Sequence, residues 1–464
     1  MECFIRDGSV VNSLHSPKLD DGRGVRSTDR FRLALVASPF AFLGGASQRS
    51  EFVLPYLARE FNVTLLLPQI AIDGLIALDR RDFALTKLQE YSGWGVSIPA
   101  ETLHRLEYPF LVDKPRSPIR FLSESREREI ARAYIDYVRD ADLIYSHHEA
   151  YEAVYLAREL ARGLTHESVG VAVLLQLQPF YSNPLSELVS LSRYLGPAEA
   201  LTLLGRLDRR FAARTLYRAM LGDRVLKLLL STSTVPLRLS GLDKVNVNRV
   251  VLRPAACLSQ GFTQDRPPKV DAPYALWYSR LTPEKGIYEL IDVWEIVHRV
   301  FPSIQLVVAG RYEDRLTERR VRRVLIARGL DRSVRFEGFL STQALRALIS
   351  GASVHIYPAH EDSFGLVIME SLSLGTPVVA FNTPAVGEIY GGTPGVNTVP
   401  DFAIEAMALE VIRILGTSEE KMTAVMNSEE TRRLVAAHSS VEAVAQAEVT
   451  AISDYLVSRK TVRT

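Results

Sequence analysis

The sequence predicts an α/β protein of two domains, each built on a parallel β-sheet with helices on both faces. Two observations carry this prediction. The chain has 464 residues, and a single hydrophobic core stops growing at about 250–300 residues, so two domains are expected. Short apolar, β-rich runs alternate with helical segments along both halves, which is typical of parallel sheets.

Composition and charge narrow the possible partners. Apolar residues make up 47% of the chain, and its 55 basic and 54 acidic residues nearly cancel, so nucleic acid is not expected as a partner. Cys3 and Cys257 are the only cysteines, and no zinc-ligand spacing occurs. No apolar run reaches the ~18 residues of a membrane span. We expect a cytoplasmic protein in which residues 1–30 form an N-terminal extension without the apolar core of a signal peptide.

The first half reads as a domain over 31–260. A helix is expected over 49–61, kinked at Pro55, and a long basic, leucine-rich helical region over 184–227. Strands are expected over 31–40, 62–67, 141–145, 169–176, 228–232 and 249–252.

The proline-rich stretch 261–271 is the best linker candidate. A second domain is expected over 272–440, followed by a helical tail over 441–464 that could return to the first domain. Its strands are expected to start at Tyr274 and over 304–309, 334–336, 354–357 and 377–381, with helices over 286–300, 316–328, 341–350 and 366–374, and further helix from 403 onward.

The run from 354 to 381 is the most informative part of the chain. It reads as strand, loop, helix, strand, with Asp362 at the loop and Glu370 about two helical turns later. We expect Ser363 to cap the helix, and Ser363, Phe364 and Gly365 to offer backbone N–H groups to a phosphate. A carboxylate such as Glu370 suits the hydroxyls of a ribose. By spacing alone, a solvated acidic loop is an equally good interpretation.

Two cations, Arg280 and Lys285, lie five residues apart on the expected turn RLTPEKG, which Gly286 ends. Two positive charges at such a turn match a diphosphate leaving group. Alone, the pattern also fits a surface turn with two solvated cations.

Two features of the first half point to the same region. Gly44 and Gly45 follow the first strand and would allow close approach of the backbone to a ligand. His147 follows the strand that ends at Tyr145, where ligands of parallel sheets bind. A plain turn and a satisfied structural histidine are the alternatives. No G-x-G-x-x-G or Walker A pattern occurs.

Taken in order, these features resemble the retaining glycosyltransferases of family 4. The segments RLTPEKG, VVAG, FEGF and EDSFGLVIMESLSLGTPVVA carry the resemblance in the second half, and FLGGAS and DLIYSHHEA carry it more weakly in the first. The resemblance implies the GT-B fold, two Rossmann-like domains with parallel sheets facing a cleft.

It also implies a nucleotide-diphosphate sugar donor, a hydroxyl acceptor on a glycan or a lipid-linked carrier, and neither metal nor cofactor. Arg280 and Lys285 would hold the diphosphate, and Glu370 the ribose. Asp362 would contact the donor sugar, with Glu361 beside it. Gly44 and Gly45 would close over the donor, with His147 near the reacting carbon.

Three positions depart from the family pattern. Asp362 stands where the family usually has Glu, Ser279 replaces a glycine, and Arg-Pro-Ala at 253–255 replaces Pro-Asn-Gly. These departures leave open a nucleotide-sugar epimerase or phosphorylase on the same fold, or a non-catalytic nucleotide-sugar-binding subunit. The basic region 184–227 could contact an anionic membrane surface, or pack as an insertion on its own domain.

Overall fold

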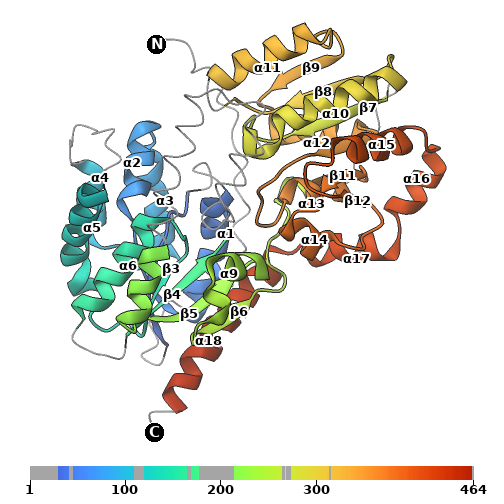
Figure 1. Ribbon diagram of the computed structural model, residues 1–464. Helices are drawn as coiled ribbons and strands as arrows, with labels where there is room; N and C mark the ends of the chain where they lie inside the picture. The colour runs from blue at the N-terminus through green and yellow to red at the C-terminus, as the bar shows by residue number, and fades with distance from the viewer. Residues whose placement is uncertain are drawn as a thin grey trace.

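The protein has two α/β lobes, and each is built on a parallel sheet of six strands (Figure 1). This computed structural model describes residues 30–40, 45–108, 120–164, 169–176, 214–263, 267, 273–312 and 315–461. The prediction of two parallel-sheet domains is confirmed.

The first sheet has the strand order β2-β1-β3-β4-β5-β6. Its central strands are buried along their whole length, as expected for a sheet covered on both faces. The strands are β1 (Arg32–Val36), β2 (Asn62–Leu66), β3 (Leu143–Ser146), β4 (Gly170–Leu175), β5 (Leu226–Ser231) and β6 (Asn248–Val251).

Of the helices described in the first lobe, only α1 was predicted individually; α2 to α6 and α9 were not. Pro55 lies inside α1, as predicted. The helices are α1 (Gly45–Glu60), α2 (Gln69–Ala77), α3 (Arg81–Gly93), α4 (Ala100–Glu107), α5 (Arg120–Tyr134), α6 (Tyr151–Gly163) and α9 (Thr234–Ser240).

The second sheet has the order β12-β11-β10-β7-β8-β9. Every pair of neighbouring strands is parallel. The strands are β7 (Tyr274–Tyr278), β8 (Gln305–Ala309), β9 (Val334–Gly338), β10 (Val354–Tyr357), β11 (Val378–Phe381) and β12 (Val396–Val399).

The predicted helices of the second lobe are present, together with a short helix, α14, that was not predicted. The region after residue 403 is a series of four helices rather than one. The helices are α10 (Ile287–Val300), α11 (Arg315–Ala327), α12 (Thr342–Gly351), α13 (Leu366–Ser373), α14 (Pro384–Tyr390), α15 (Ile404–Leu415), α16 (Glu419–Met426), α17 (Glu429–Ala437) and α18 (Val441–Thr461).

The last helix, α18, leaves the second lobe and packs against α1 and β5 of the first (Figure 1). The chain therefore crosses between the lobes twice. The two crossings touch, because the Leu258 amide donates to the carbonyl of His438 over 2.8 Å. Buried residues of the first crossing, Leu252, Ala255 and Leu258, join the two lobes in one apolar cluster.

Candidate functional site

Each sheet has one point where its strand order reverses, and the predicted site residues lie beside these points. In the second sheet the reversal falls between β7 and β10, and in the first between β1 and β3. Ligands of open parallel sheets bind beyond the carboxyl ends of the strands at such a point. Arg280 and Lys285 follow β7, Asp362 follows β10, and His147 follows β3.

Lys285 and Asp362 come together at the reversal in the second sheet. The Lys285 ammonium lies 2.8 Å from Asp362 Oδ2 and donates to the carbonyl of Glu361 over 3.0 Å. Both side chains are largely buried, with exposed fractions of 14% and 21%. The ammonium is therefore held at the start of α13, where the helix dipole would also favour an anion.

Gly286 allows the turn after β7 to come close to the chain that follows β10. Its φ is +77°, and a Cβ built there would lie 1.9 Å from the carbonyl oxygen of Pro358. The turn after β7 thus packs directly on the chain that leaves β10. No residue with a side chain fits at this position without moving the backbone.

Asp362 satisfies both of its oxygens within the protein. Its Oδ1 accepts from the amides of Ser363, Phe364 and Gly365 over 2.9, 3.3 and 3.0 Å. Its Oδ2 accepts from Lys285 and from the Tyr357 hydroxyl. Burial alone raises the pKa of Asp362, but Lys285 and these donors outweigh it and hold the pKa at about 2. The carboxylate is therefore ionised at neutral pH.

These contacts correct two expectations about the helix start. The N-cap position of α13 is Gly365, with φ +74°, and no side chain caps it, so Ser363 is not the cap. The three amides expected to face a phosphate donate instead to Asp362. A short carboxylate reaches them because it sits one residue before the first of these amides.

Glu370 lies on α13, two turns from Asp362, and is half-buried. The Tyr278 hydroxyl lies 3.1 Å from Glu370 Oε2. Burial raises the pKa of Glu370 to about 7, although the hydroxyl opposes that rise. Of the remaining predicted residues, Arg280 is exposed at the end of β7, whereas the side chain of Glu361 is buried.

Two tyrosines of this site were missed in the sequence. Tyr278 and Tyr357 are the last residues of β7 and β10, and their hydroxyls bond Glu370 and Asp362 respectively. His355 lies between them, stacked on Tyr278 with ring centroids 4.7 Å apart. A tyrosine ending each strand at the reversal was the available signal.

His147 is buried in a separate polar cluster of the first lobe. Its Nδ1 lies 2.8 Å from Ser50 Oγ, and its Nε2 lies 2.6 Å from Oε1 of Glu448 on α18. Glu448 also bonds Arg49 over 2.8 Å and the Tyr145 hydroxyl over 2.8 Å. Only 1% of the His147 side chain is exposed. With both ring nitrogens engaged, His147 fits the structural alternative better than a place near the reacting carbon.

The neighbouring His148 is half-exposed and has a different environment. Its Nδ1 accepts from the amide of Ala150 over 2.8 Å. Burial, with a smaller effect of His147, lowers the pKa of His148 to about 4. The ring is therefore neutral at pH 7, with its proton on Nε2. The sequence places two adjacent histidines after β3, and only their hydrogen bonds in the structure distinguish the two environments.

Two expectations fall partly on residues outside the described ranges. Gly44 lies outside the described ranges, whereas Gly45 is the first residue of α1. Most of 184–227 also lies outside, and the described part, from residue 214, contains a helical stretch and the start of β5.

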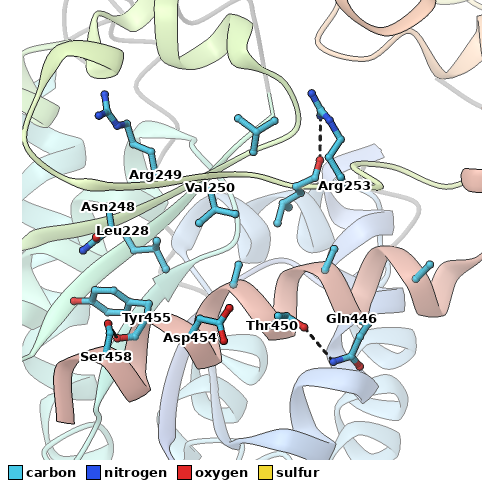
Figure 2. A pocket seen from close by; sticks show the side chains of 15 residues that line it. Leu228, Asn248, Arg249, Val250, Arg253, Gln446, Thr450, Asp454, Tyr455 and Ser458 are labelled. Atoms are coloured by element: carbon cyan, nitrogen blue, oxygen red, sulfur yellow. Dashed lines mark hydrogen bonds between the residues drawn. The ribbon is translucent and has the colours of Figure 1, made fainter. Parts of the chain in front are cut away.

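A groove of about 750 Å³ lies between β6 and α18, away from both reversals (Figure 2). Figure 2 shows Arg249 and Arg253 above it, and Gln446, Thr450 and Asp454 on the helix below. None of the predicted site residues lines this groove.

Comparison with known proteins agrees with this arrangement. Residues 262–395 match the family model described as glycosyl transferases group 1. The matched segment contains the Lys285–Asp362 pair and Glu370.

Two curated relatives each match about a third of this chain. The glycogen synthase of Mycobacterium tuberculosis (strain CDC 1551 / Oshkosh) is 34% identical over 139 residues, which are 29% of this chain and 32% of the relative. The alpha-D-kanosaminyltransferase of Streptomyces kanamyceticus is 31% identical over 150 residues, 32% of this chain and 38% of the relative. The chain thus aligns with about a third of the length of these relatives.

Similarity to solved structures extends over both lobes. Anabaena Alr3699/HepE, solved in complex with UDP, has a TM-score of 0.61 at 14% identity, covering 91% of this chain and 100% of that one. At this identity the match shows the fold alone, and that fold is GT-B, as the resemblance implied.

Proposed function

We propose that the protein is a retaining glycosyltransferase that moves a sugar from a nucleotide-diphosphate sugar to a hydroxyl acceptor. The observation that carries the proposal is the Lys285 ammonium, held 2.8 Å from Asp362 at the reversal of the second sheet. It lies within the segment that matches glycosyl transferases group 1. Anabaena Alr3699/HepE, with UDP bound, supports a nucleotide ligand for this fold.

In this proposal Lys285 and Arg280 bind the diphosphate and stabilise the charge that grows on it as the sugar departs. Glu370 accepts hydrogen bonds from the ribose hydroxyls. Asp362 orients Lys285 and the start of α13. The donor lies mainly on the second domain, and the acceptor approaches from the first.

His148 takes the position near the reacting carbon that the sequence suggested for His147. Its Nε2–H is available in the neutral ring, so it can donate to a sugar hydroxyl. A diphosphate oxygen, on the face that the acceptor enters, accepts the acceptor's proton. Since the two cations meet the diphosphate charge, we expect no metal requirement.

The acceptor is a glycan or a lipid-linked carrier, and the protein works in the cytoplasm or at the inner face of a membrane. Within the described ranges, no helix is both long and apolar enough to cross a bilayer.

The test is a screen of the purified full chain against UDP-, GDP- and ADP-sugars by thermal shift, followed by turnover with the donor that binds best. A ligand at 100 times its Kd raises the free energy of unfolding by about 2.7 kcal/mol. We expect one base to stand out, activity that survives EDTA, and a product with the donor's anomeric configuration. Donor binding without sugar transfer or hydrolysis would favour a non-catalytic subunit, and an inverted product would exclude the retaining mechanism.

A further inference from the structure

Helix α11 of the second lobe presents an unusual outward face. Its core-facing residues recur every four positions, at Thr317, Val321 and Leu325, and all three are buried. At 100° per residue, the opposite side carries two large aliphatic side chains and four arginines. These exposed residues are Arg315, Leu316, Arg319, Arg322, Arg323 and Ile326.

The charge of this outer face has one sign. The helix contains five arginines and a single acid, Glu318. Glu318 lies on the flank and pairs with Arg322 over 3.0 Å. Among the described residues, Arg319 and Arg323 have no acidic partner. Glu313 and Asp314, which precede the helix, lie outside the described ranges.

The two aliphatic residues on the outer face of α11 are exposed to solvent. Leu316 is 57% exposed and Ile326 is 67% exposed. They are ten residues apart, which is about 15 Å along a helix, and the arginines lie between them. Single exposed aliphatic residues are common, but here two lie on the same face as Arg319 and Arg323, which have no acidic partner among the described residues.

The helix is also well placed to meet a flat partner. It leads into β9, the edge strand of the second sheet. Figure 1 shows α11 at the outer margin of the second lobe, on the side away from the first. The helix α11 therefore lies at the periphery of the second lobe.

We propose that the outer face of α11 binds the headgroup region of an anionic lipid bilayer. The guanidinium groups match the negative surface potential of such a bilayer, and the two aliphatic side chains enter the headgroup boundary as those of interfacial helices do. A bilayer accepts isolated aliphatic side chains from a convex helix, whereas a protein partner would need a pocket matched to each. The surface is distinct from the 184–227 region, and the inference does not depend on the proposed reaction.

The experiment measures binding of the full chain to vesicles by flotation, at low salt and then at rising salt. One vesicle contains phosphatidylcholine with about a third phosphatidylglycerol, and the other contains phosphatidylcholine alone. Three double variants are compared with the wild type: R319Q/R323Q, L316Q/I326Q and, as a matched control, R432Q/R433Q. The control pair is exposed on α17. All changes lie on surfaces, so unchanged thermal midpoints are required of each variant.

We expect binding to anionic vesicles only, weakening as salt rises. Removing two cations from a bilayer contact should lower the partition coefficient roughly tenfold or more, so R319Q/R323Q should bind far less than R432Q/R433Q. L316Q/I326Q should also bind less. Absence of wild-type binding at low salt would overturn the proposal, as would equal losses in the two arginine variants. Binding of the α11 face to an acidic protein or to RNA, but not to vesicles, would overturn it as well.

Discussion

At the scale of single residues, the Asp362 carboxylate is occupied by the protein's own donors. Its carboxylate receives three amides, an ammonium and a hydroxyl, which is more than the roughly four lone-pair sites of a carboxylate. No site remains for a sugar hydroxyl. In the proposed function, Lys285 can donate to a diphosphate while it stays paired with Asp362, because an ammonium has three donors and the described residues engage only two.

The first prediction concerns the cations. Changing Lys285 or Arg280 to Ala should lower turnover by roughly 10²-fold or more, because charge stabilisation in the transition state is lost. The exposed Lys421 on α16 provides the matched control, and Lys421→Ala should leave turnover unchanged. Steady-state kinetics with the donor found by the screen gives the comparison. Full activity in both Lys285→Ala and Arg280→Ala would remove the diphosphate assignment.

The second prediction uses the pKa of Glu370, which burial raises to about 7. Ribose hydroxyls would donate to the ionised carboxylate, so nucleotide binding should lower this pKa and release a proton. Affinity should therefore increase as the pH rises from 6 to 8. Calorimetry in two buffers of different ionisation enthalpy measures the proton directly. In Glu370→Gln the release should vanish, and an unchanged release in that variant would place the titrating group elsewhere.

At this scale the sequence indicated which charged residues to consider, whereas their contacts came from the structure. Lys285 and Asp362 each follow an expected strand, and Glu370 was singled out by its spacing from Asp362. The direction of the Asp362 carboxylate, and the choice between His147 and His148, depend on individual hydrogen bonds, some local and some between segments far apart in the chain. Spacing carries no information of that kind.

At the scale of elements, the turn at Gly286 should be intolerant of any side chain. A Cβ there would meet the Pro358 carbonyl, whereas Gly329, with a similar φ of +69°, has nothing within 4 Å. Gly329→Ala should therefore cost only the left-handed backbone term, about 1–2 kcal/mol. Gly286→Ala should cost more, and it should weaken nucleotide binding because it displaces Lys285. Thermal midpoints and calorimetry test both; equal costs in the two variants would contradict the close approach.

The elements of the second lobe were mostly predicted, and those between β2 and β3 were not. Buried strands such as β10, which Pro358 follows, and β11, which Pro377 precedes, are short β-rich runs bounded by proline. No side chain caps the N-termini of helices α2 and α3. Their apolar faces are set by packing on neighbouring elements rather than by a strong local pattern, so no local signal marked them.

At the scale of the whole molecule, α18 links the end of the chain to the first lobe through charge. Glu448 is fully buried and lies between Arg49 of α1 and His147. Burial alone raises the pKa of Glu448, but the charges of His147 and Arg49 outweigh it and lower the pKa to about 2. Arg49 also donates to the carbonyl of Ala255, in the first crossing between the lobes. The Glu448 carboxylate thus links α18 to α1 and, through Arg49, to the first crossing between the lobes.

The last prediction follows from this buried charge. Removing one partner of a buried ion pair costs about 3–5 kcal/mol, so Glu448→Gln should lower the free energy of unfolding by that amount at pH 7. The exposed Glu442 of the same helix is the control, and Glu442→Gln should cost almost nothing. Urea unfolding of the three proteins makes the comparison.

Repeating the unfolding measurements at lower pH provides the second part of the test. Because the folded-state pKa lies below that of the unfolded chain, the contribution of Glu448 is present above about pH 4.5 and is lost as the pH falls toward 2. The advantage of the wild type over Glu448→Gln should therefore shrink across this window, while the difference from Glu442→Gln stays small. A wild-type advantage that persists unchanged at pH 3 would mean that Glu448 acts through packing rather than charge, and that α18 is held to the first lobe by its apolar contacts alone.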